Sequence, residues 1–173
     1  MKIGFVGLGN MGNAIAVHLL KAGHKLVIND LARELQSNLE IQGARWCDDL
    51  AKLGAGCEAV FTALPGPADV EQVMLGAGGV LGGMERGACY IDLTTSSAET
   101  VAKVAAAAAD RGVHMLDAPM IGKVADARDA SLCLHVGGDA ADVKTCEPLL
   151  KQFAREVRHL GPTGAGIASL AQG

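Results

Sequence analysis

A glycine-rich turn directly after the first hydrophobic segment constrains this chain more than any other feature. Residues 2–6 read as a short buried strand, and Gly7-Leu8-Gly9-Asn10-Met11-Gly12 follows with the spacing G-x-G-x-x-G. Residues 11–22 then carry apolar side chains at helical spacing, at Met11, Ile15, Leu19 and Ala22. The spacing alone is weak evidence. A strand, this turn and a helix in that order are typical of a dinucleotide-binding fold.

Each glycine of the turn has its own physical role. Gly7 permits the tight bend, Gly9 lets a pyrophosphate approach the backbone without meeting a Cβ, and Gly12 lets the helix pack close to the strand. Amides at the helix N-terminus, favoured by the helix dipole, then hold the anion without a lysine. We therefore expect the whole turn to line the cofactor site: Gly7, Leu8, Gly9, Asn10, Met11 and Gly12.

Asp30 follows the second predicted strand, residues 25–29, about 20 residues beyond the glycine turn. A carboxylate at this position accepts hydrogen bonds from an adenosine ribose and repels a 2′-phosphate, and only Arg33 is near enough in sequence to offset that repulsion. The alternative is that Asp30 merely caps a helix that begins near Leu31. The ribose interpretation favours NAD as the cofactor, with NADP the second candidate.

The composition fits one α/β domain. Of the 173 residues, 50% are hydrophobic, only 3% are aromatic and 23 are glycine, which suits an alanine- and valine-rich sandwich with tight turns. The net charge of −4 argues against nucleic acid or an anionic membrane as a partner. No apolar run has the length of a transmembrane helix, and the glycine turn begins close to Met1, so we expect a soluble, cytoplasmic protein.

Five cysteines are scattered without a C-x-x-C pair: Cys47, Cys57, Cys89, Cys133 and Cys146. An odd number without a pattern is typical of reduced thiols, most of them small core residues. His114, Cys133 and His135 could be imagined as a metal site, but the last two simply alternate along a predicted strand. We therefore expect no metal.

Strands and helices alternate along almost the whole chain. The predicted strands are residues 2–6, 25–29, 44–47, 59–64, 88–93, 113–117, 131–136 and 156–159. The predicted helices are residues 11–22, 32–41, 48–53 and 69–75, an alanine-rich helix that ends at 110, and residues 140–153. Ser96 and Glu99 have the spacing of a capping box for the alanine-rich helix. This order predicts a Rossmann-type, doubly wound and mostly parallel sheet with helices on both faces.

In such sheets a ligand lies beyond the carboxyl ends of the strands, so the loops after the strands are candidate site segments. They are Leu64-Pro65, Thr94-Thr95-Ser96 and residues 118–123. Ordinary turn chemistry explains Leu64-Pro65 as well as a function does. For the other two loops, their clustering at one edge of the sheet favours a function.

Several further segments occur in a recognisable order after the glycine turn. They are Leu64-Pro65, Asp92-Leu93-Thr94-Thr95, Asp117-Ala118-Pro119 with Gly122, Val136-Gly137-Gly138, and Gly161-Pro162-Thr163-Gly164-Ala165-Gly166. Together they resemble the β-hydroxyacid dehydrogenase family, which includes 3-hydroxyisobutyrate dehydrogenase, tartronate semialdehyde reductase and the nucleotide domain of 6-phosphogluconate dehydrogenase. The resemblance covers essentially the whole chain.

The resemblance implies an NAD(P)-dependent hydride transfer between nicotinamide and a small hydroxy acid or its aldehyde. It also implies two sets of site residues. Those that line the cofactor are Leu64, Pro65, Asp69 and Thr95. Those that face the substrate carboxylate are Thr94, Ile121, Gly122 and Lys123, where a glycine-rich turn can point amides at an anion.

The chain departs from the family in its substrate loop, which usually reads D-A-P-V-S-G-G. Here the loop continues as Met120-Ile121-Gly122-Lys123. Ile121 stands in place of a hydroxyl donor and favours a more apolar substrate. Lys123 either pairs with an acidic group or simply points to solvent.

A second departure concerns the family's catalytic lysine, the general acid/base expected four residues after the last glycine of G-x-G. Leu170 occupies that position, or the lysine is missing outright. Such a group contributes roughly 100-fold to 10,000-fold to a rate, and Lys123 is the one candidate substitute. We expect residues 1–162 to form the dinucleotide-binding domain and residues 163–173 the truncated start of an inter-domain helix, without the family's all-helical second domain.

Two interpretations follow from these departures. In the first, the chain is the nucleotide-binding half of an NAD-dependent oxidoreductase. In the second, it is a cofactor-binding or regulatory module without turnover. In both, an apolar edge left uncovered predicts a homo-oligomer.

Overall fold

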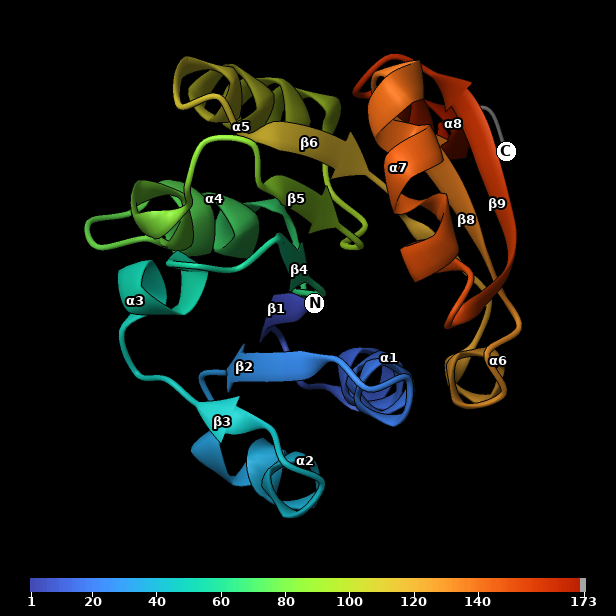
Figure 1. Cartoon of the computed structure of the whole chain (residues 1–173). Coiled ribbons are helices and arrows are strands. Elements are labelled where there is room, and N and C mark those ends of the chain that lie inside the picture. The colour runs from blue at the N-terminus through green and yellow to red at the C-terminus, as the bar shows by residue number, and fades with distance from the viewer. Residues whose placement is uncertain (172–173) are drawn as a thin grey trace.

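The computed structural model describes residues 1–171 and consists of one mixed sheet with helices packed on both faces (Figure 1). Its strands are β1 (Lys2–Val6), β2 (Lys25–Asn29), β3 (Arg45–Trp46), β4 (Ala59–Thr62), β5 (Cys89–Asp92), β6 (His114–Asp117), β7 (Met120–Ile121), β8 (Leu132–Gly137) and β9 (Ala154–Gly161). Its helices are α1 (Asn10–Lys21), α2 (Ser37–Ile41), α3 (Leu50–Gly54), α4 (Pro67–Leu75), α5 (Ala98–Asp110), α6 (Val124–Arg128), α7 (Ala140–Leu150) and α8 (Ala165–Leu170), with short 3-10 turns η1 (Arg33–Gln36) and η2 (Val80–Gly83).

The strand order is β3-β2-β1-β4-β5-β6-β8-β7, and β9 pairs with β8. The strands from β3 to β6 are parallel, β8 runs antiparallel to β6 and β7, and β9 is parallel to β8. The prediction of a mostly parallel, Rossmann-type sheet is confirmed. The direction of strand addition reverses at β1, so the glycine turn after β1 lies at the topological switch point, where such sheets bind ligands.

Two apolar cores fill the layers on either side of the sheet. On one face, Ile15 and Leu19 of α1 and Leu149 of α7 are buried. On the other, Val70 of α4 and Val104 of α5 are buried. Ile15 and Leu19 lie one turn apart on the same side of α1, which is why helical spacing in the sequence predicted this helix correctly.

Some predicted boundaries were wrong. The predicted helix 32–41 is split into η1 and α2. The cap of α5 is Ser97, whose hydroxyl accepts a hydrogen bond from the Thr100 amide at 3.2 Å, so the capping box predicted at Ser96 and Glu99 is one residue out of register. The second error is local, because the neighbouring serine offers the same capping chemistry.

Residues 118–123 were predicted as a loop but contain β7, and α6 follows at residues 124–128, where no element was predicted. β7 forms an antiparallel pair with β8, in which Met120 lies opposite Leu134. The carboxylate of Asp126 then accepts a hydrogen bond from the Lys123 amide at 2.7 Å, at the start of α6. Elements this short depend on their tertiary neighbours, so their sequences carry little periodic signal. Among residues 1–171, no helix combines the length and apolar character needed to cross a bilayer.

Candidate functional site

The turn between β1 and α1 requires two of its glycines for reasons of packing. Gly7 has φ +104°, and a Cβ there would collide with the carbonyl oxygen of Ala63 at the end of β4. A Cβ on Gly12 would collide with the carbonyl oxygen of Gly7. These two glycines therefore let β1, α1 and the loop after β4 meet at close range.

Gly9 differs from both, because nothing within the protein requires a glycine there. Its φ is −63°, which any residue adopts, and apart from its neighbours along the chain no described heavy atom lies within 4 Å of the place where its Cβ would be. The first hydrogen bond of α1 runs from the Asn13 amide to the Gly9 carbonyl at 2.8 Å. The amides of Asn10, Met11 and Gly12 precede that bond and have no partner within the helix. Open space in front of such amides fits an anionic pyrophosphate.

Asp30 lies beside this turn and supports it. One carboxylate oxygen accepts a hydrogen bond from the Leu8 amide at 2.6 Å, and the other accepts one from the Ala32 amide at 2.7 Å. The N-cap residue of η1 is Ala32, so Asp30 does not cap a helix at Leu31. The side chain of Leu8 is buried in the core, and its backbone amide donates its hydrogen bond to Asp30. Each carboxylate oxygen keeps a free lone pair for a further donor.

Arg33, the cation closest in sequence to Asp30, is engaged elsewhere. Its guanidinium carbon lies 4.3 Å from the ring centroid of Trp46, and its Nη1 is 2.9 Å from a carboxylate oxygen of Glu40. The charge of Arg33 is thus paired with Glu40 and stacked on an aromatic face. It is not directed toward the carboxylate of Asp30.

A hydrogen-bonded chain joins the ends of β4 and β5. The hydroxyl groups of Thr62 and Tyr90 are 2.5 Å apart, and the Thr62 hydroxyl also contacts an Asp92 carboxylate oxygen at 2.9 Å. The same carboxylate oxygen accepts a hydrogen bond from the Thr94 amide at 3.0 Å. The Thr94 hydroxyl in turn accepts a hydrogen bond from the Leu64 amide at 3.0 Å. The two loops predicted to line the site are therefore held together by side chains buried beneath them.

Asp92 has one carboxylate oxygen without a hydrogen-bond partner among residues 1–171. The residue is 1% exposed, and its burial raises the pKa of the carboxyl to about 6, against the hydrogen bonds from Thr94 and Thr62 that lower it. The nearby Asp117 carboxylate adds to the increase in pKa. Around neutral pH, Asp92 is therefore a buried charge with incomplete compensation.

The pKa of Asp92 predicts a pH-dependent stability. In the unfolded chain the carboxyl ionises near its ordinary pKa of 3.8, whereas in the folded protein it keeps its proton to about pH 6. The folded state binds more protons in this window, so the free energy of unfolding falls as the pH rises from about 4 to 6. For this single group the expected loss is about 3 kcal/mol. The variant Asp92→Asn keeps an acceptor for Thr94 but has no carboxyl group, so it should not lose stability over this pH range. Urea unfolding at pH 4.5 and 7.5 measures the free energy of unfolding of both proteins. Parallel pH profiles for the parent and the variant would contradict it.

In the sequence, Asp117 stands out only as part of the motif Asp117-Ala118-Pro119. In the structure, its side chain holds two backbone segments together. It is fully buried, and its two carboxylate oxygens accept the amides of Gly164 at 2.6 Å and Ile167 at 2.9 Å. Burial raises the pKa of its carboxyl, although these backbone hydrogen bonds lower it. Asp117 thereby connects the end of β6 to the first turn of α8. The sequence signals for this contact are an aspartate at the end of a strand and a distant glycine-rich turn.

The predicted substrate loop lies at the β7 end of the sheet. Ile121 is 37% exposed and the side chain of Lys123 is also exposed, without an ion pair to any described residue. Gly122 has φ +142°, and a Cβ there would lie 2.9 Å from the Leu132 side chain. Both alternatives for Lys123 stay open, because nothing within residues 1–171 uses its charge.

The remaining predicted site residues differ in how far they are exposed to solvent. Pro65 and Thr95 are exposed, and Asp69 is half-buried in the first turn of α4. Thr94 is 1% exposed, and its oxygen already accepts the Leu64 amide. Leu170 is partly buried against the core on the α4 and α5 face.

The histidine and cysteine residues considered for a metal are not brought together. The His114 ring contacts the Asp142 carboxylate at 3.1 Å, whereas the His135 ring contacts the Ser169 hydroxyl at 2.9 Å. Within residues 1–171, no group of three metal-ligating side chains is formed.

A cavity of about 440 Å³ lies beside the glycine turn, lined by Gly9, Asn10 and Asn13 of the turn and α1 and by Leu35 and Asn38 from the next helical segment. The glycine turn follows β1, Leu64 follows β4 and Thr94 follows β5, so all three lie at the carboxyl edge of the sheet. This is the edge that the sequence predicted for ligand binding.

Known proteins with similar sequences share this architecture. The family model described as the NAD binding domain of 6-phosphogluconate dehydrogenase matches residues 2–161. The 3-hydroxyisobutyrate dehydrogenase of Pseudomonas aeruginosa is 40% identical over 164 residues, which cover 95% of this chain and 55% of that protein. The 2-(hydroxymethyl)glutarate dehydrogenase of Eubacterium barkeri is 36% identical over 168 residues, which cover 97% of this chain and 56% of that protein.

Solved structures agree with the sequence comparison. A 3-hydroxyisobutyrate dehydrogenase from Mycobacterium tuberculosis, solved with L-serine, matches with a TM-score of 0.93 and 32% identity. The match covers 99% of this chain and 58% of that one. The chain therefore spans a little over half the length of these relatives.

Proposed function

Since the chain belongs to the family of the NAD binding domain of 6-phosphogluconate dehydrogenase, we propose that it is the cofactor-binding half of an NAD-dependent oxidoreductase. The reaction is hydride transfer between nicotinamide and a small hydroxy acid or its aldehyde, the class to which the dehydrogenases named above belong. The observation that carries this proposal is the open space at Gly9, in front of amides that have no partner within α1.

Each part of the site then has a role toward the cofactor. The amides of Asn10, Met11 and Gly12 bind the pyrophosphate. The carboxylate of Asp30 accepts hydrogen bonds from the ribose hydroxyl groups. The further residues that flank the cofactor are Leu64, Pro65, Asp69 and Thr95. NAD itself supplies the hydride acceptor, and the protein supplies its binding and orientation.

The substrate side is formed by the end of β5 and the loop after β7. Ile121 contributes an apolar surface and Lys123 a cation for the carboxylate or a second acidic group of the substrate. Thr94 contributes through the backbone it fixes, because its hydroxyl is engaged by Leu64. A short hydroxy acid with an apolar substituent fits these residue types.

The domain boundary is part of the same proposal. Residues 1–162 form the binding domain, and residues 163–173 begin a connecting helix. The contacts of Asp117 with Gly164 and Ile167 tie the start of that helix to the sheet. Residues 172 and 173 lie outside the described residues.

The geometry around Asp30 favours NAD over NADP. A 2′-phosphate would lie near the Asp30 carboxylate and would need a cation to offset the repulsion. Arg33 is the nearest candidate, and it is paired with Glu40 and stacked on Trp46. Binding NADP would require breaking both contacts.

Replacing Asp30 by alanine is expected to weaken NAD binding by roughly 10-fold to 100-fold, the value of hydrogen bonds to a charged group. The affinity for NADP should fall less, because the variant also loses a repulsive charge. Calorimetric titration with both cofactors measures the ratio, and Asp129→Ala, at an exposed position, is the matched control. If the affinities for NAD and NADP fell equally, Asp30 would only support the Leu8 amide and would not contact the ribose.

The second candidate function is a cofactor-binding module without turnover. It is supported by the expectation that Leu170 stands at the position of the family's lysine, or that the lysine is missing outright, and by the packing of Leu170 against the core. An assay of the chain with NAD against a panel of small hydroxy acids and aldehydes tests whether the chain turns over a substrate by itself. Binding without turnover supports the module or a separated half, whereas turnover that is lost in Lys123→Ala assigns proton transfer to Lys123.

A further inference from the structure

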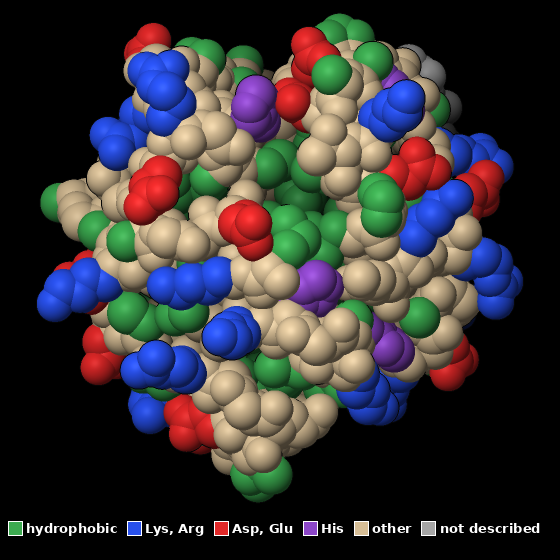
Figure 2. All heavy atoms as spheres, in the orientation of Figure 1, with side chains coloured by type: hydrophobic (Ala, Val, Ile, Leu, Met, Phe, Trp, Pro, Cys, Tyr) green, Lys and Arg blue, Asp and Glu red, His purple; other side chains and the backbone are tan. Residues whose placement is uncertain are grey.

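A cavity of about 610 Å³ opens at the edge of the sheet opposite to the glycine turn. It lies where β4, β5 and β6 begin and α7 crosses beside them, and Figure 2 shows the hollow with hydrophobic side chains at its base. Its lining includes Cys89, His114, Asp142 and Cys146. None of these residues belongs to the proposed cofactor site, so the cavity needs a separate explanation.

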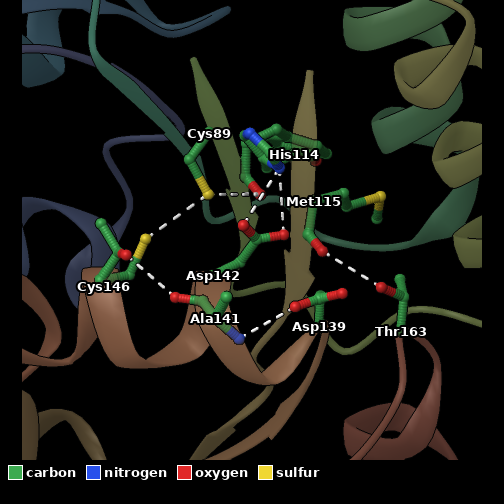
Figure 3. A network of polar contacts seen from close by, with 10 residues as sticks. Cys89, His114, Met115, Asp139, Ala141, Asp142, Cys146 and Thr163 are labelled. Carbon is green, nitrogen blue, oxygen red and sulfur yellow. Dashed lines mark hydrogen bonds and ion pairs between the residues drawn. The ribbon is translucent and has the colours of Figure 1, made fainter. Parts of the chain in front are cut away.

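Two of these lining residues are cysteines that face each other across the gap between sheet and helix. Cys89 is the first residue of β5 and Cys146 lies in α7, and their sulfur atoms are 3.6 Å apart (Figure 3). A disulfide bond is about 2.05 Å long, so the two sulfur atoms need to approach by about 1.5 Å. Each side chain is 8% exposed, and both line the cavity through which a small reagent can arrive.

We propose that Cys89 and Cys146 form a reversible intramolecular disulfide and are a redox modification site of this protein. The pair joins residues 57 positions apart in the chain. Closure cross-links the start of β5 to α7 and leaves the opposite end of β5, at Asp92, unchanged.

The reaction is a thiol–disulfide exchange with a low-molecular-weight disulfide. The Cys146 thiolate attacks one sulfur of the reagent, which forms a mixed disulfide and releases one thiol. The Cys89 thiol then loses its proton and attacks the Cys146 sulfur, which forms the intramolecular bond and releases the second thiol. The protein thus loses two protons and two electrons, and the reagent is reduced to two thiols.

The surroundings of the two sulfur atoms support this order of attack. The hydrogen bond that Cys146 shares with Cys89 lowers the pKa of Cys146, although burial and the Asp142 carboxylate act in the opposite direction. The shared hydrogen bond, burial and Asp142 all raise the pKa of Cys89. Asp142 is itself in contact with the His114 ring at 3.1 Å, on the wall of the same cavity (Figure 3).

The other cysteines have different partners. The thiol of Cys47 donates to the Asp49 carbonyl at 3.2 Å, and that of Cys57 donates to the Leu53 carbonyl at 3.1 Å. Cys133 lies on β8, where burial raises the pKa of its thiol. Among the described residues, only Cys89 and Cys146 have sulfur atoms in hydrogen-bond contact with each other. No spacing or motif in the sequence distinguishes this pair from the other cysteines.

The test uses the chain with Cys47→Ser, Cys57→Ala and Cys133→Ser, which leaves only the proposed pair. Incubation with oxidised glutathione is expected to remove both free thiols, to lower the intact mass by two hydrogen atoms and to leave no glutathione attached. The thermal midpoint should rise by roughly 5 to 10 °C, and dithiothreitol should reverse every change. The affinity for NAD should stay within about twofold of the reduced form, because the cross-link lies at the far edge of the sheet.

Adding Cys146→Ser to that background is expected to stop the loss of both thiols and leave at most one glutathione adduct on Cys89. Proteolytic mapping of the oxidised parent chain should give the same Cys89–Cys146 cross-linked peptide without any substitution. Persistent mixed disulfides on both cysteines, covalent dimers as the main product, or two unreacted thiols would each overturn the proposal.

Discussion

Replacing Gly9 by valine is expected to lower the affinity for NAD at least about 100-fold while leaving the fold intact. Gly9 has an ordinary φ of −63° and an open Cβ position, so the backbone accommodates the substitution without a clash at the Cβ. It occupies the space in front of the Asn10, Met11 and Gly12 amides, which the pyrophosphate needs. Calorimetric titration with NAD measures the affinity, and the thermal midpoint reports on the fold.

Gly82→Val is the matched control for this experiment. Gly82 also has an open Cβ position and no left-handed φ, but it lies in η2, away from the turn. The control should bind NAD as the parent does. If Gly9→Val retained normal binding, the glycine turn would not be the phosphate site. If it lost binding together with a large fall in the thermal midpoint, the loss would be one of folding.

Replacing Asp117 by alanine is expected to lower the free energy of unfolding by about 3 kcal/mol. The amides of Gly164 and Ile167 would lose their acceptor at a buried position. Removing a carboxylate whose pKa burial raises recovers part of that cost, so the net loss is smaller than the sum of two orphaned amides. Urea unfolding at neutral pH measures it.

The control for Asp117 is again Asp129→Ala, which should change stability by no more than about 0.5 kcal/mol. Asp117→Asn keeps one acceptor oxygen and should fall between the alanine variant and the parent. A loss of less than about 1 kcal/mol for Asp117→Ala would show that the first turn of α8 finds other partners. Amide hydrogen exchange of Ile167 would then remain protected.

Sequence periodicity and glycine spacing were sufficient for the fold class and the position of the glycine turn. Apolar positions one turn apart define α1, and a continuous apolar run defines the buried strand β4. The roles of Gly7 and Gly12 were also predictable, because each depends on a local meeting of strand, turn and helix. Short elements such as β7 and α6 were missed, because their stability comes from neighbours rather than from a pattern of their own.

The sequence placed the candidate site residues at the carboxyl ends of strands, but it did not predict the contacts among them. The sequence indicated that Asp30 and the Thr94 loop belong at the ligand edge. It gave no sign that Asp30 accepts the Leu8 amide, 22 positions away, or that Thr94 accepts the Leu64 amide, 30 positions away. Both side chains therefore support the backbone at this edge of the sheet.

The sequence by itself determined the order of strands and helices, the turn suited to an anion and the family to which the chain belongs. These features depend on residues close together in the chain, where spacing alone fixes which face or bend a side chain occupies. Only the tertiary structure decided that Asp117 holds α8 and that Cys89 meets Cys146. Those partners are 47 and 57 positions apart, and their contact depends on how the sheet brings separate strand ends and helices together.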